Sequence, residues 1–151
     1  MSNDNQSLSQ QEFDDIYSKV PRLTVEIIIK NKVGEIYLTK RAIEPCKGKW
    51  HLPGGTVRYG EPMGETIKRI AKRELGINVK KAQNVGYIEY PSHYRRGLDS
   101  PVGIVFEVTN FDGSLLINKE SQMGDWFKRI PANMNEDQDI FLLNYKYLNN
   151  S

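Results

Sequence analysis

The chain has 151 residues, with 21 basic and 19 acidic side chains and a net charge of +2, which is the size of one domain. The chain lacks the basic excess of a nucleic-acid-binding protein. No apolar run approaches the roughly 20 residues that cross a bilayer. The polar N-terminus lacks the apolar core of a signal peptide. Hydrophobic residues make up 38%, too many for a disordered chain, and a single cysteine, Cys46, excludes an internal disulfide and a multi-cysteine zinc site. These features predict a cytoplasmic protein that binds neither nucleic acid nor membrane.

The first predicted element is a short helix that follows a flexible tail, residues 1–8. Ser9 and Glu12 have the spacing of a capping box, in which each side chain bonds the backbone N–H of the other residue. Apolar residues at helical spacing follow, and Pro21 ends the helix. Residues 9–151 are expected to form a single domain.

Two strands are predicted next, over residues 23–31 and 35–41, because both segments are rich in β-branched and aromatic residues. The turn at 32–34 contains a glycine and separates them. Residues 50–52 form a short extended piece before a Pro-Gly-Gly turn at 53–55.

The clearest predicted helix spans residues 62–75. Pro62 suits its first position, where no N–H is needed. Gly76 suits the C′ position, where the backbone adopts a positive φ.

The remaining elements are strands at 84–91, 102–109 and 125–130, a polar loop at 92–100, and a closing helix at 135–148. Strands interspersed with helices predict an α/β fold with a mixed sheet packed between helices. The apolar residues that share one stripe of the closing helix are Ile140, Leu143 and Tyr147.

The segment from residue 54 to residue 77 carries the chemistry. Its double glycine lets the backbone approach a ligand closely, and the helix that follows presents free N–H groups suited to a diphosphate. Positions 70, 73 and 74 share one helix face, where carboxylates would hold Mg²⁺. The sequence places Ile70, Arg73 and Glu74 there.

This segment resembles the signature of the Nudix hydrolase family. Five residues separate the first matching glycine from a glutamate, and seven more separate that glutamate from an arginine. The resemblance extends over about residues 23–131 and implies a Nudix-type α/β/α sandwich with a mixed sheet, in which the box at 55–77 forms a loop–helix–loop. The matching residues are Gly55, Glu61, Arg69, Glu74, Gly76 and Ile77.

The resemblance also implies roles for these residues. The carbonyl of Gly55 and the carboxylates of Glu74 and Glu120 would bind Mg²⁺, with Mn²⁺ as the alternative ion. Glu74 and Glu120 would be the catalytic residues, and Glu120 would also activate water. Glu61 and Arg69 would brace the box through an ion pair, and Gly76 would complete the structural part of the box.

Two acidic positions of the family signature are lost, to Ile70 and Arg73. The segment 69–74 therefore carries a net charge of +2, which favours one bound metal ion over two or three. A reduced box of this kind is similar to that of the GDP-mannose mannosyl hydrolase-like subgroup, which attacks the anomeric carbon of a sugar. That subgroup has a histidine base just after the position of Glu120, where this chain has Ser121, so Glu120 becomes the candidate base.

Four residues are candidates for substrate binding. Arg41 and Arg58 are placed to contact a diphosphate, whereas Arg73 is either a phosphate contact or a solvated charge. His93 belongs to an aromatic and basic segment, 90–96, which either borders the sugar site or forms a solvated loop.

The favoured function is Mg²⁺-dependent hydrolysis of a nucleoside diphosphate linked to another group, most of all a nucleotide sugar. One alternative is attack at phosphorus on a nucleoside triphosphate or an ADP-ribose-like substrate. Another is a catalytically degenerate module that binds a nucleotide without cleaving it. Family members are often homodimers, so a homodimer is one further expectation.

Overall fold

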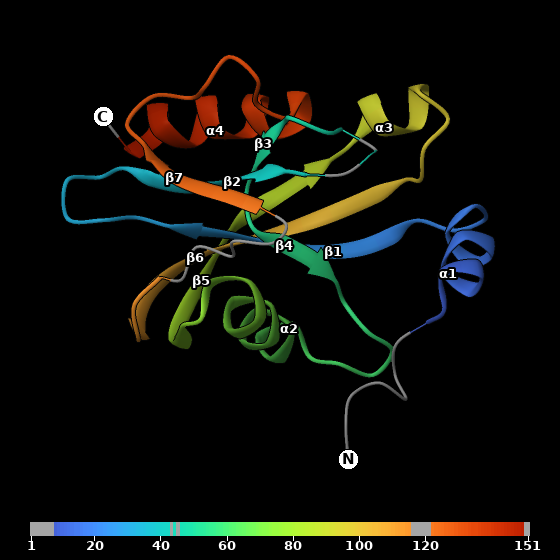
Figure 1. The fold of residues 1–151 in the computed structure, drawn as a ribbon, viewed down its shortest axis with the longest axis horizontal. Coiled ribbons are helices and arrows are strands. Elements are labelled where there is room, and N and C mark those ends of the chain that lie inside the picture. Colours follow the sequence, from blue (N-terminus) through green and yellow to red (C-terminus); the bar gives the residue numbers. More distant parts are fainter. Residues whose placement is uncertain (1–7, 43, 45, 116–121, 150–151) are drawn as a thin grey trace.

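The computed structural model describes residues 8–42, 44, 46–115 and 122–149 (Figure 1). No helix in these ranges is long and apolar enough to cross a membrane. The elements along the chain are α1 (Gln10–Tyr17), β1 (Arg22–Ile29), β2 (Ile36–Arg41), β3 (Trp50–His51), β4 (Gly54–Thr56), α2 (Met63–Ile70), a π-helical turn (Ala71–Leu75), β5 (Asn78–Glu89), α3 (Pro91–Arg95), β6 (Pro101–Asp112), β7 (Gln122–Phe127) and α4 (Glu136–Asn149).

The strands form two sheets. The larger has the order β4-β1-β6-β5, in which β1 and β6 are parallel and the other pairs are antiparallel. The smaller has the order β3-β2-β7 and is antiparallel throughout. Helix α2 lies on one side of the strands, and α3 and α4 lie on the other (Figure 1). This arrangement confirms the predicted α/β fold with a mixed sheet between helices.

Strand β1 is central to both cores because both of its faces are covered. Ile27 packs with Ile70 and Leu75 beneath α2, whereas Ile28 packs with Leu142 of α4. A strand buried on both faces reads as an almost continuous apolar run. Side chains alternate along a strand, so the one acidic residue in this run, Glu26, shares the face of Ile28.

The predicted ends of the first two helices are close to those observed. The Ser9 hydroxyl accepts a hydrogen bond from the Glu12 N–H at 3.1 Å, and the Ser9 N–H donates to the Glu12 carboxylate at 3.0 Å, which confirms the capping box. Gly76 ends the second helix with φ +71°, as predicted. Pro62 is the N-cap and not the first helical residue, and the last turn is π-helical instead of α-helical.

Other predicted boundaries were wrong where long-range pairing decides the structure. Strand β5 begins at Asn78 and not at residue 84, because its N-terminal half pairs with the end of β6 despite two register shifts there. The expected turn at 53–55 contributes to β4, which pairs with β1. The expected loop at 92–100 includes the short helix α3, which begins at a proline.

The predicted apolar stripe of the closing helix was also wrong at Ile140 and Leu143, whereas the side chain of Tyr147 lies outside the described residues. Ile140 is 62% exposed and Leu143 is 57% exposed. The buried stripe consists instead of Gln138, Leu142 and Tyr145, at positions i, i+4 and i+7. A glutamine takes part because its amide oxygen accepts a hydrogen bond from the buried Leu52 N–H at 2.7 Å, and apolar periodicity does not reveal such a partner.

Candidate active site

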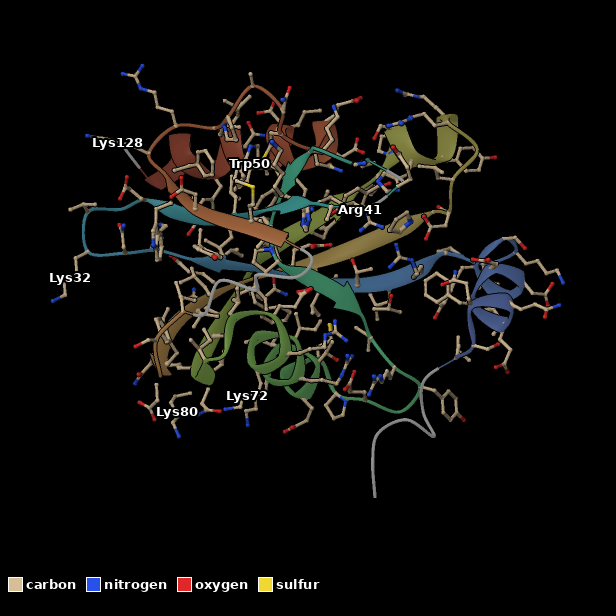
Figure 2. All side chains as sticks on the ribbon, in the orientation of Figure 1. Lys32, Arg41, Trp50, Lys72, Lys80 and Lys128 are labelled. Carbon is tan, nitrogen blue, oxygen red and sulfur yellow. The ribbon has the colours of Figure 1, made fainter. Side chains whose placement is uncertain are left out.

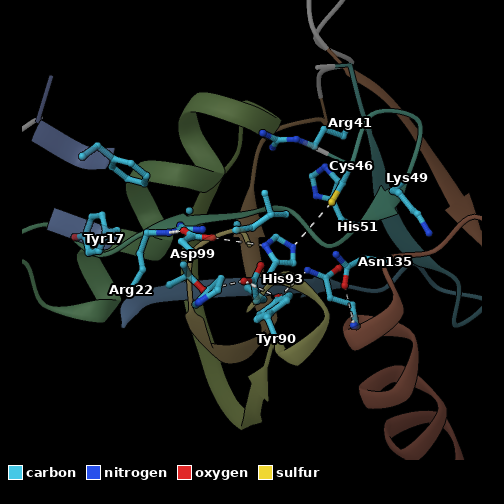
Figure 3. A pocket seen from close by; sticks show the side chains of 18 of the residues that line it. Tyr17, Arg22, Arg41, Cys46, Lys49, His51, Tyr90, His93, Asp99 and Asn135 are labelled. Atoms are coloured by element: carbon cyan, nitrogen blue, oxygen red, sulfur yellow. Dashed lines mark hydrogen bonds and ion pairs between the residues drawn. The ribbon is translucent and has the colours of Figure 1, made fainter. Parts of the chain in front are cut away.

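A cavity of about 900 Å³ opens between α1, β1 and the segment that contains α3 (Figure 3). Its size lies at the upper end of the range for small-molecule sites, about 300–1,000 Å³. Figure 3 shows Tyr17 and Arg22 at one side of the cavity and Arg41 and Lys49 at the other, with Tyr90 and His93 between them. Residues from six regions of the chain contribute to the wall, including Phe13, Glu26, His51, Gly55, Asp99 and Gln138.

The box that leads into this cavity is held together by a single carboxylate. Glu61 receives two hydrogen bonds from the Arg69 guanidinium, both at 2.8 Å, one from the Thr66 hydroxyl at 2.7 Å and one from the Arg58 N–H at 3.1 Å. The hydrogen bonds from Arg69 hold the pKa of Glu61 at about 2. Arg69 also donates to the Thr56 carbonyl at 2.9 Å. These contacts join the loop, β4 and α2, as expected for a brace.

Ile70 occupies one of the two altered acidic positions and serves the core. It is fully buried, and a Cβ placed on Gly55 would lie 2.8 Å from its Cδ1 atom. The isoleucine therefore packs directly on the backbone of β4, and a side chain at position 55 would require Ile70 to shift. At this position the helix offers close packing and no metal ligand.

Glu74 is the last acidic residue of the box, and it is not part of the cavity wall, although its charge is close enough to raise the pKa of Glu26, which is part of that wall. The Glu74 side chain is 19% exposed, and the Arg73 guanidinium is 4.0 Å from its carboxylate. Burial raises the pKa of Glu74, and the charges of Arg73 and Arg69 lower it. The Arg73 side chain is itself 56% exposed and is not part of the cavity wall, while Lys72 points outward from the helix (Figure 2).

Glu74 and Gly55 offer oxygen atoms of the kind that bind a hard cation. The Glu74 carboxylate and the backbone oxygen of Gly55 are the oxygen ligands that Mg²⁺ takes, and Mg²⁺ commonly completes its shell with water and substrate phosphates. Within the described ranges, no group of three or more His, Cys, Asp or Glu side chains forms a metal cluster. Glu120 lies outside the described residues, so its roles as ligand and base stay predictions.

Glu26 is the residue of the cavity wall that sequence reasoning missed. It is 7% exposed, and its Oε1 atom accepts hydrogen bonds from the Thr24 hydroxyl at 2.9 Å and the Tyr90 hydroxyl at 3.0 Å. Burial raises the pKa of Glu26 to about 7, against the opposing hydrogen bonds and the charge of Arg22, and the nearby charge of Glu74 raises it further. The available signal was a lone acidic residue inside the most apolar strand.

His93 lies inside the cavity wall, although the residues that follow it, 94–97, are exposed. Its side chain is 15% exposed, whereas Tyr94 is 71% exposed. The His93 Nδ1 atom is 3.6 Å from Asp99, and Nε2 is 4.0 Å from the Cys46 sulfur. Asp99 accepts a hydrogen bond from Arg22 at 2.5 Å. The His93 imidazole, whose Nδ1 atom is too far from Asp99 for a hydrogen bond, is the largest influence holding the pKa of Asp99 at about 2, and the Arg22 guanidinium adds to it.

Of the two arginines expected to contact a diphosphate, Arg41 lies in the cavity wall and Arg58 does not. Arg41, at the end of β2, is part of the cavity wall (Figure 2). Burial lowers the pKa of His51 beside it, and the charge of Arg41 lowers that pKa further. Arg58 is not part of the wall, and its backbone N–H supports Glu61 instead. The cavity wall therefore brings together Arg41, His93 and Gly55 from the predicted set, but not Glu74, Arg58 or Arg73.

Comparison with known proteins agrees with this geometry. The model of the NUDIX domain family matches residues 20–143, which include both sheets, the box and most of α4. The chain belongs to the Nudix hydrolase family. The match begins after α1, so the cavity wall built by Phe13 and Tyr17 lies outside the part that the family model describes.

Individual Nudix relatives share the same core. The chain is 33% identical over 112 residues to the low-salt glycan biosynthesis protein Agl8 of Haloferax volcanii, covering 72% of this chain and 71% of Agl8. It is 33% identical over 107 residues to an ADP-ribose pyrophosphatase of Methanocaldococcus jannaschii, covering 71% of this chain and 62% of that protein. The crystal structure of a MutT Nudix hydrolase from Burkholderia pseudomallei superposes with a TM-score of 0.74 at 26% identity, covering 83% of this chain and 98% of that one.

Proposed function

We propose that this Nudix hydrolase cleaves a nucleoside diphosphate linked to another group, with a nucleotide sugar as the favoured substrate and Mg²⁺ as its cofactor. The observation that carries the proposal is the altered face of the box helix. Ile70 is buried against Gly55, and Arg73 is largely exposed, so Glu74 is the one carboxylate that this face provides.

A single carboxylate favours attack at carbon over attack at phosphorus. Attack at phosphorus puts charge on a crowded phosphoryl group, which benefits from two metal ions. Attack at the anomeric carbon develops positive charge on the sugar, and the diphosphate is the leaving group. In that reaction the water oxygen bonds to the anomeric carbon, the bond from that carbon to the diphosphate oxygen breaks, and the products are a free sugar and a nucleoside diphosphate.

The cavity supplies binding groups for the two parts of such a substrate. Arg41 and Lys49 are cationic residues of its wall, suited to the phosphates. Glu74 and the Gly55 carbonyl would hold Mg²⁺, which when bound would neutralise charge on the leaving diphosphate. His93 and Asp99 line the cavity and offer polar contacts to sugar hydroxyls.

The two relatives favour different substrates, one a nucleotide sugar and the other ADP-ribose. Agl8 is named as a glycan biosynthesis protein, which favours a substrate that contains a sugar. The second relative is named as an ADP-ribose pyrophosphatase, which favours cleavage between the two phosphates. Both candidates share a nucleoside diphosphate bonded to a further group.

Incubation of the purified protein with Mg²⁺ and a panel of nucleotide sugars, ADP-ribose and nucleoside triphosphates tests the proposal. We expect a nucleoside diphosphate and a free sugar, separated by ion-exchange chromatography. A nucleoside monophosphate with a sugar phosphate would establish the ADP-ribose-type alternative. Tight binding without turnover under Mg²⁺ or Mn²⁺ would instead support the module that only binds nucleotides.

A further inference from the structure

The Glu26 carboxylate presents one oxygen atom to the cavity without a partner. Both of its hydrogen bonds within the described residues go to Oε1. Oε2 accepts no hydrogen bond from those residues. It is also not fully enclosed by the protein, so it can be reached from the cavity. Since Glu26 is part of the cavity wall, Oε2 is an acceptor available to a ligand.

A directional chain of hydrogen bonds fixes which oxygen is available. The Leu52 N–H can only donate, so the side-chain atom of Gln138 that it contacts at 2.7 Å is the amide oxygen. The Gln138 amide nitrogen therefore donates to the Tyr90 hydroxyl at 2.9 Å, and that hydroxyl must give its own proton to Glu26. Oε1 is thereby saturated by two donors, and Oε2 is left as the acceptor.

The backbone around Glu26 is shaped to accommodate this carboxylate. A Cβ on Gly54 would lie 2.2 Å from Oε2, and a Cβ on Gly103 would lie 2.9 Å from Oε1. Glycines on the two strands that flank β1 therefore leave the space that the carboxylate occupies. An isolated buried carboxylate is costly, so a donor from the ligand would relieve a cost that the fold itself leaves uncompensated.

The cavity also supplies a surface for a planar ring. Phe13 and Tyr17 of α1 lie edge to face with ring centroids 4.7 Å apart, and the Arg22 guanidinium is 5.4 Å from the Phe13 centroid. All three residues line the cavity, and Tyr17 and Arg22 lie at the side away from Arg41 and Lys49 (Figure 3). Aromatic and guanidinium planes stack on nucleobases, so this side suits the base and the opposite side suits the phosphates.

We propose that Glu26 Oε2 accepts a hydrogen bond from the 6-amino group of adenine or the 4-amino group of cytosine in the substrate's base, so that the enzyme selects these bases over their keto counterparts, hypoxanthine and uracil. This inference rests on the proposed function, since it assigns the base of that substrate. A keto oxygen at the same place would set two acceptors against each other in a buried site, and unpaired buried acceptors reduce affinity by roughly 10- to 100-fold.

Calorimetric binding of matched nucleotides to the whole protein tests this assignment. The pairs are AMP with IMP and CMP with UMP, without a divalent ion and at about pH 8.5, where Glu26 is ionised. We expect the amino member of at least one pair to bind roughly 10- to 100-fold more tightly. In Glu26→Gln the amide nitrogen replaces Oε2, so the preference disappears or reverses. The exposed carboxylate of Glu89 provides the control, and Glu89→Gln is expected to keep the preference.

Equal affinities within both pairs for the unmodified protein would overturn the assignment, and so would a preference that survives Glu26→Gln or the absence of binding by all four nucleotides. The first of these needs no variant, so it holds even where Glu26→Gln does not fold. Turnover without base preference would refute the role of Glu26 and leave the proposed function intact. Base preference without turnover would support the role of Glu26 while removing the proposed hydrolysis.

Discussion

Two carboxylates of this protein, one partly buried and one buried, have opposite surroundings. Glu61, in the box, is satisfied by donors from Arg69, Thr66 and the backbone, and its pKa is held at about 2. Glu26, in the cavity wall, receives donors on one oxygen only, and burial raises its pKa to about 7. The hydrogen-bonding capacity of Glu61 is met by donors of the protein itself. Glu26 keeps one oxygen atom that can accept a hydrogen bond from a ligand in the cavity.

The difference separates stability from function. A carboxylate that is fully hydrogen-bonded and paired favours its charged form and stabilises the fold. A buried carboxylate with a free oxygen costs stability, and such perturbed groups cluster at functional sites. Glu74 stands between the two regions, because it belongs to the box helix and its charge reaches Glu26.

The largest expected effect is the loss of turnover in Glu74→Gln. Removing the charge of the one box carboxylate near the cavity weakens Mg²⁺ binding, and we expect kcat to fall by roughly 100-fold or more, which corresponds to about 3 kcal/mol of transition-state stabilisation. Steady-state kinetics with Mg²⁺ on the substrate found in the panel measures the change. The control is Glu65→Gln on the exposed part of α2, where the side chain is 61% exposed. Full activity of Glu74→Gln would contradict its role.

Glu61→Gln should cause the largest loss of stability. It leaves the guanidinium of Arg69 without its charged partner, which costs about 3–4 kcal/mol and lowers Tm by roughly 6–12 °C in a domain of this size. Because the pKa of Glu61 is lowered, its contribution is present above about pH 4.5 and is lost as pH falls to about 2. Thermal unfolding followed by circular dichroism should show that the difference in Tm between variant and parent becomes smaller as pH falls over that range. A Tm difference that does not depend on pH would be evidence against the brace.

The Glu26→Gln substitution should increase the stability of the fold at high pH, whereas Glu61→Gln decreases it. The raised pKa of Glu26 means that the folded state holds a proton that the unfolded state releases between about pH 4.5 and 7, so the parent protein loses stability as pH rises through that window. Removing the carboxyl removes this loss, on the order of 3 kcal/mol by about pH 8. Urea unfolding at several pH values should therefore show that the free energy of unfolding of the variant, relative to that of the parent protein, increases with pH. A variant that is less stable than the parent at about pH 8 would contradict this explanation.

A pair of glycine variants gives the smallest effects and tests the space around Glu26. Gly54→Ala places a Cβ 2.2 Å from Oε2 and 2.5 Å from the Val25 carbonyl, and we expect it to cost about 1–3 kcal/mol. Gly64→Ala in α2 meets nothing within 4 Å, and it should stabilise the helix by about 0.5 kcal/mol. Similar unfolding midpoints for the two variants would show that the close packing at Gly54 is unimportant.

Local patterns predicted the box, but they did not predict the cavity. The brace and the glycine cap lie within 16 residues, from position 61 to position 76, so spacing alone indicated which residues meet. The cavity brings together α1, β1, α3 and α4, and no short-range pattern says that Tyr90 will reach Glu26, 64 residues away. The apolar stripe of α4 was misplaced for the same reason, because the partner of Gln138 is 86 residues distant.

The position of oxygen from water in the products tests the central claim most directly, namely that a box with one carboxylate near the cavity supports attack at carbon. Turnover in ¹⁸O-labelled water with Mg²⁺, read by mass spectrometry, should place the label on the free sugar and leave the nucleoside diphosphate unlabelled. Label on a phosphate would show that these residues suffice for attack at phosphorus, and it would contradict the mechanism proposed for this protein.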